Sequence, residues 1–100
     1  MKRFNGLTPE EDERLSLLAE ECSEVIQAVM KIKRHGYDSH HPRGGPDNRR
    51  HLEKELGHLR LATCLMIDRG DVWEEEIEIA LDDKALEIDQ YLHHNTVKRS

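Results

Sequence analysis

Two pairs of potential metal ligands lie in this chain, each with its members three residues apart in a helical pattern. The first pair is Glu21 and Glu24, and the second is Glu55 and His58. Residues three apart lie on one side of a helix. Both pairs border an apolar stripe that is expected to be buried, where a carboxylate without a partner is costly or shifts its pKa. A divalent cation shared by both pairs is the most economical partner.

The donor set indicates which cation to expect. Three carboxylates favour a hard, oxygen-seeking ion such as Mg²⁺ or Mn²⁺, and two such pairs on facing helices are one way in which bundles build metal sites. Two other interpretations remain open. In the first, the charged groups extend past the apolar stripe to solvent and bind no metal. In the second, His51 joins Glu55 and His58 on one helix face as a Zn²⁺ site.

Three helices must position these side chains. The first is predicted over 8–34, where Thr8, Pro9 and Glu11 form a capping start and Gly36 follows the end. Its expected buried stripe contains Leu18, Cys22, Val25, Ile26 and Val29.

A second helix is predicted over 48–69, capped by Asp47 or Asn48, with a seam of Leu52, Leu56, Leu59, Thr63 and Met66. Gly57 would allow a close helix approach. A third helix is predicted over 71–94, with Asp71 as its cap.

The loop at 35–47 contains three glycines and two prolines. It is either a mobile connection or a lid over a site, and its Arg43, together with His40 and His41, is available to bind phosphate.

Composition restricts the class of protein. The 100 residues predict one all-α domain, 1–100, and with 36% hydrophobic residues, four aromatic residues and a mean hydropathy of -0.81 the core of a single chain would be thin. We therefore expect a homo-oligomer, a dimer or higher. The net charge of -6 argues against binding a nucleic acid polymer, and no segment is apolar enough to span a membrane.

Cysteine usage indicates the compartment. Cys22 and Cys64 both lie in apolar periodic segments, which suits buried free thiols in a reducing environment, so a cytoplasmic location is expected.

The residues EECSE at 20–24, followed after a loop by ELGH at 55–58, resemble the EExxE…ExxD signature of the MazG-like all-α nucleoside triphosphate pyrophosphohydrolases, small forms of which occur in bacteria and phages. The resemblance covers roughly Leu17 to Tyr91. It implies a helical bundle assembled as dimers or tetramers, Mg²⁺ held by Glu21, Glu24, Glu55 and His58, and hydrolysis of the α–β phosphoanhydride of a nucleotide to a monophosphate and pyrophosphate.

The same resemblance suggests further roles. Glu20 and Glu21 are the candidate catalytic carboxylates, with Glu20 as the base to test, although a solvated Glu20 is equally compatible with the pattern. Lys84, a cation on an otherwise apolar face, is expected to reach substrate phosphates or to extend past the seam. By its place at the start of the second helix, and apart from the resemblance, Asn48 would cap that helix or bind base or sugar. Arg43 would bind substrate from the loop.

His58 departs from the family pattern, because the signature has Asp there. An imidazole supplies one negative charge fewer and a softer donor, which favours Mn²⁺ and other transition metals relative to Mg²⁺. Three outcomes follow: an active enzyme with altered metal preference, a weakened enzyme, or a nucleotide-binding regulatory module. A helical interaction protein without a metal site is the remaining alternative.

Overall fold

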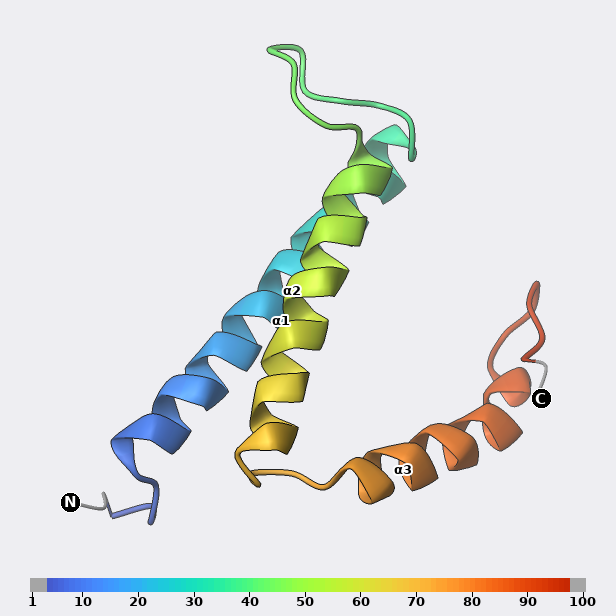
Figure 1. Ribbon diagram of the computed structural model, residues 1–100. Coiled ribbons are helices and arrows are strands. Elements are labelled where there is room, and N and C mark those ends of the chain that lie inside the picture. Colours follow the sequence, from blue (N-terminus) through green and yellow to red (C-terminus); the bar gives the residue numbers. More distant parts are fainter. Residues whose placement is uncertain (1–3, 98–100) are drawn as a thin grey trace.

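The computed structural model describes residues 4–97, and over this range the secondary structure is helical, without strands. Helix α1 spans Pro9–His35, α2 spans Asn48–Asp68 and α3 spans Glu74–Glu87, and a single 3₁₀ turn, η1, follows at Ile88–Gln90 (Figure 1). The predicted all-α class is confirmed for this part of the chain. None of its helices is both long enough and apolar enough to cross a membrane.

Helix α1 begins with the predicted capping box. The Thr8 hydroxyl accepts from the Glu11 N–H at 3.1 Å, and the Glu11 carboxylate accepts from the Thr8 N–H at 2.8 Å. Pro9 occupies the first helical position, and the chain leaves the helix at Gly36, whose φ of 87° favours glycine. The observed helix begins one residue later and ends one residue later than the predicted 8–34.

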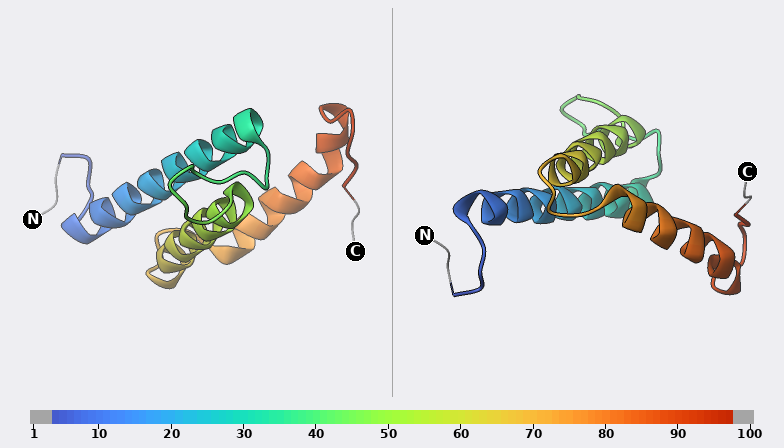
Figure 2. Two further views of the ribbon diagram at one scale, coloured as in Figure 1. Left: turned by 90° about the horizontal axis from the view of Figure 1, so that it is seen from above. Right: turned by 60° about the horizontal axis from the view of Figure 1, so that its bottom comes forward.

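Helices α1 and α2 run antiparallel and lie side by side, joined by the loop at their far end (Figures 1 and 2). The buried residues of this interface are Ala28, Glu55, Ala62 and Met66. Two of the four are alanines, whose small side chains allow the helix backbones to approach closely. The interface is the main packed region among the described residues.

Met66 of the predicted seam is buried, but the packed face of the two helices is rotated away from other residues of that seam. Ile26 is 63% exposed and Leu56 is 45% exposed, and both cysteines are exposed rather than buried. The helices meet through the neighbouring stripe, which carries Glu21, Ala28 and Glu55. Gly57 does not serve helix approach either, because a Cβ built there meets no atom within 4 Å.

Helix α3 is shorter than the predicted 71–94. Asp71 does not cap it: its carboxylate accepts from Arg14 at 2.5 and 2.9 Å, and its N–H donates to the Met66 carbonyl. Trp73 precedes the first turn and provides no side-chain cap. The helix then projects away from the α1–α2 pair (Figures 1 and 2).

This projection gives an elongated molecule. The radius of gyration is 17.2 Å, whereas a compact chain of 100 residues has about 13 Å. The accessible surface is 8381 Å², about 2,500 Å² more than expected for a compact chain of this mass. Large apolar side chains on α3 and its flanks contribute to the excess: Trp73, Ile79, Leu81, Leu86 and Tyr91.

Candidate metal centre

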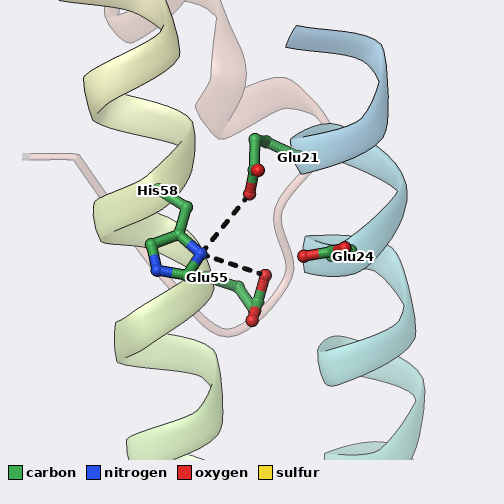
Figure 3. Close-up of side chains that lie close together, drawn as sticks. All are labelled: Glu21, Glu24, Glu55 and His58. Atoms are coloured by element: carbon green, nitrogen blue, oxygen red, sulfur yellow. Dashed lines mark ion pairs between the residues drawn. The ribbon is translucent and has the colours of Figure 1, made fainter. Parts of the chain in front are cut away.

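Four side chains converge midway along the α1–α2 interface. Glu21 and Glu24 point from α1 toward α2, and Glu55 and His58 point back from α2 (Figure 3). One ligand atom from each of the four lies within 4.8 Å of those of the others, so the group could hold a metal ion. The convergence follows from the rotated interface, which turns the stripe of acidic residues inward.

The burial of the group increases toward Glu55. The Glu55 side chain is 5% exposed, that of Glu21 is 13% exposed, and the His58 ring is 45% exposed. A buried carboxylate needs compensation, and a half-open site leaves room for ligands from solvent. The cluster therefore has buried carboxylates, Glu55 and Glu21, and a solvent-accessible imidazole, His58.

The His58 ring lies close to both Glu21 and Glu55, the most buried carboxylates of the cluster. Its Nδ1 lies 3.5 Å from Glu21 Oε2 and 3.7 Å from Glu55 Oε2. These separations are too long for good hydrogen bonds, and both of those oxygens are buried without a hydrogen-bond partner in the described structure. Buried polar atoms are rarely left unsatisfied, so the two oxygens fit a cation as their missing partner.

Glu24 also responds to the crowding of acidic groups. Hydrogen bonding to the Glu55 carboxyl group raises the pKa of Glu24 above its ordinary value, and the negative charge of Glu55 adds to the effect. A neighbouring negative charge disfavours the ionised form of Glu24. A divalent cation would reverse this effect by favouring the ionised Glu24 carboxylate.

Three carboxylate oxygens and one imidazole nitrogen are thus the donor set. It suits Mg²⁺ or Mn²⁺ by its oxygens and leans toward a transition metal by its nitrogen. The alternative zinc set does not converge: His51 Nε2 lies 3.7 Å from Glu55 Oε1, but the only group of at least three ligand side chains found along 4–97 is the one without His51.

The remaining predicted site residues are not gathered around this cluster. The Glu20 side chain is exposed on α1, one residue before Glu21. Lys84 lies on α3, where its Nζ is 3.8 Å from Glu87 and 5.5 Å from the centre of the Tyr91 ring. Arg43 is exposed on the loop, and its backbone N–H donates to the His41 ring.

Asn48, the first residue of α2, has a structural role toward the loop. Asp47 is the residue that caps α2, accepting from the Arg50 N–H at 2.8 Å. The Asn48 side chain instead donates to the Gly36 carbonyl at 3.0 Å, and its N–H donates to the Ser39 carbonyl at 2.8 Å. Asn48 therefore fastens the start of the loop to the start of α2.

A cavity of about 500 Å³ lies between this loop and the adjoining ends of α1 and α2. Its lining includes Lys31 and Arg34, which sequence reasoning did not assign to a site. Lys31 follows Glu24 by seven residues, two helical turns, and thus shares its stripe. That spacing was the available signal.

Comparison of the chain with protein-family models, with characterised proteins and with solved structures finds no match.

Proposed function

We propose that this protein is a metal-dependent nucleotide pyrophosphohydrolase that cleaves the α–β phosphoanhydride of ribo- or deoxyribonucleoside triphosphates, or of related nucleotides. The products are a nucleoside monophosphate and pyrophosphate. The observation that carries the proposal is the convergence of Glu21, Glu24, Glu55 and His58 within 4.8 Å. These are the four positions at which the resemblance to MazG-like proteins puts metal ligands.

The chemical types of the candidate residues suggest a role for each. Glu21, Glu24, Glu55 and His58 would hold Mg²⁺ or Mn²⁺, and such an ion, when bound, neutralises phosphate charge and acidifies a water molecule. Glu20 directly precedes Glu21 on α1 and is exposed, so its carboxylate is the candidate acceptor of the proton from that water. Lys84, Asn48 and Arg43 are the candidate substrate contacts.

The proposal includes a homo-oligomer in the cytoplasm. A single chain exposes about 2,500 Å² more surface than a compact chain of its mass, and permanent interfaces between subunits are of this size or larger. Packing of α3 against a second copy would also complete a helical bundle. In such an assembly Lys84 could approach the metal cluster of the partner chain.

The test is incubation of the purified protein with a panel of nucleoside and deoxynucleoside triphosphates, first with Mg²⁺ and then with Mn²⁺. We expect release of pyrophosphate that stops when EDTA is added and is abolished in Glu55→Gln. The variant Glu53→Gln, which changes an exposed carboxylate on the same helix, is the matched control. No pyrophosphate with either metal would end the catalytic proposal.

A nucleotide-binding regulatory module is the second candidate, and His58 is the observation that favours it. Its ring supplies no negative charge where the signature has Asp, which weakens Mg²⁺ binding. This alternative predicts that nucleotides raise the melting temperature without turnover. His58→Asp separates the two: gain of hydrolysis on substitution would mark the native chain as the binding form.

A further inference from the structure

The cavity beneath the α1–α2 loop differs in charge from the rest of the molecule. The chain carries 21 acidic residues and a net charge of -6, yet no carboxylate is among the described residues that line this cavity. Two permanent cations, Lys31 and Arg34, and four histidines line it instead: His35, His40, His41 and His51. A concave surface with charge of one sign concentrates ligands of the opposite sign.

The two cations are free to meet a ligand. Neither Lys31 nor Arg34 forms an ion pair with any residue of 4–97. The nearby acidic side chains are engaged elsewhere, since Asp38 binds Arg49 and Asp47 caps α2. An anion entering the cavity therefore displaces no existing partner of either cation.

The backbone at this end is not the source of binding. The first four N–H groups of α2 already donate, to the carbonyls of Ser39, Tyr37 and Asp47 and to the Asp47 side chain. These bonds and the antiparallel bridge between His40 and Asp47 hold the loop in place. Side-chain cations on a fixed wall, rather than a helix terminus, thus determine what the cavity accepts.

The lining also indicates the chemical class. Arg and Lys together suit phosphoryl oxygens, and the lining residues include no Phe, Tyr or Trp on which a nucleobase would stack. A volume of about 500 Å³ exceeds the needs of one phosphate and falls in the ordinary range for ligand sites. The site therefore fits a chain of phosphoryl groups.

The cavity adjoins the metal cluster but is separate from it. Lys31 lies two turns beyond Glu24, about 10 Å along α1, and His51 lies one turn before Glu55, about 6 Å along α2. His51 lies between the two regions, because it lines the cavity and its Nε2 lies 3.7 Å from Glu55 Oε1. None of the cavity's cations belongs to the cluster.

We propose that this cavity is a polyphosphate-binding site, recognised by Lys31 and Arg34 and independent of any metal. The phosphoryl chain belongs either to a nucleotide or to a free polyphosphate. Both sources present the same chemistry to the cavity. The inference does not require that the protein be an enzyme.

The experiment is titration calorimetry with inorganic tripolyphosphate in EDTA, so that no metal contributes. We expect saturable binding to the native chain, weakened at least about tenfold in Lys31→Gln/Arg34→Gln because charge-assisted contacts are lost. The matched control is Lys33→Gln/Arg50→Gln, which removes the same charge from neighbouring positions outside the lining. Circular dichroism verifies that both variants are folded.

Absence of saturable binding to the native chain would overturn the proposal, as would an equal loss in the two double variants. A second titration, with a nucleoside triphosphate added beforehand, separates the sources. Competition would assign the cavity to the phosphates of the nucleotide, and simultaneous binding would assign it to a separate polyphosphate. Because these titrations contain EDTA and measure no turnover, their failure is distinct from failure of the catalytic proposal.

Discussion

Arg14 and Asp71 are joined by a two-pronged ion pair that connects α1 to the turn after α2. The Arg14 Nε and a terminal guanidinium nitrogen donate to the two Asp71 oxygens at 2.5 and 2.9 Å, and the side chains are 16% and 12% exposed. Residues 57 apart in sequence are thereby fixed together. This contact supplements the helix interface at the end away from the loop.

The pair predicts a specific loss of stability in acid. The hydrogen bonds from Arg14 lower the pKa of Asp71 below its ordinary value of 3.8, so the contribution is present above about pH 4 and is lost as pH falls through the lowered pKa. Asp71→Asn should therefore be less stable than the native chain at neutral pH, with the difference shrinking in acid. Urea unfolding across pH measures it.

Asp83→Asn, which alters an exposed carboxylate on α3, controls for the loss of one negative charge. A destabilisation by Asp71→Asn that persists unchanged into strong acid would contradict the ionic origin of this contact.

The metal cluster predicts opposite effects of one substitution with and without metal. Glu55→Gln removes the main cause of the raised pKa of Glu24, so without metal the variant should melt no lower than the native chain at neutral pH. With Mn²⁺ at about 100 times Kd the native chain gains about 2.7 kcal/mol, or roughly 10 to 20 °C. Glu55→Gln should lose nearly all of this rise, because its affinity falls about 100-fold or more.

Scanning calorimetry with Mn²⁺, Mg²⁺ and EDTA tests this prediction, with Glu53→Gln as the control. An equal metal-induced rise in Glu55→Gln and in the native chain would show that the ion binds elsewhere.

Gly57 predicts an increase in stability. A Cβ at this position meets nothing within 4 Å in the single chain, so Gly57→Ala should stabilise α2 by about 1 kcal/mol through helix propensity. Thermal unfolding should show a rise of about 4 to 8 °C. A fall in melting temperature would instead indicate that a partner chain packs against this position.

The exposed face of α3 predicts self-association. Leu81 is 58% exposed and Leu86 is 65% exposed, and burial of such side chains against a second copy is worth roughly 1.5 to 3 kcal/mol each. We expect the native chain to sediment as a dimer or tetramer, and Leu81→Glu/Leu86→Glu to shift it toward monomer. Glu75→Gln/Glu78→Gln on the same helix should leave the assembly intact; a monomeric native chain would refute the prediction.

Much of this structure could be predicted from local patterns. The capping box at Thr8 and Glu11 and the glycine at position 36 locate α1 to within one residue. The three-residue spacing places both members of each ligand pair on one side of their helix. These features depend on interactions close in sequence, which a pattern can capture.

Other features depend on tertiary competition. The interface rotated toward Ala28 and Ala62 because small residues let the helices approach, whereas hydrophobicity alone favoured Ile26 and Leu56. Asp71 was expected to cap α3, but Arg14, distant in sequence, binds it instead. A capping pattern cannot reveal that its carboxylate is claimed by a residue from another helix.

The α1–α2 contact contains both the buried alanines and the acidic cluster. The same contact therefore provides the helix packing and the candidate ion site. An ion bound there would link two helices that otherwise share few buried side chains, and would so stabilise their packing. We therefore expect thermal stability and cation affinity to be coupled in this chain. Substitutions that improve the α1–α2 packing by replacing these carboxylates would gain stability at the expense of cation affinity.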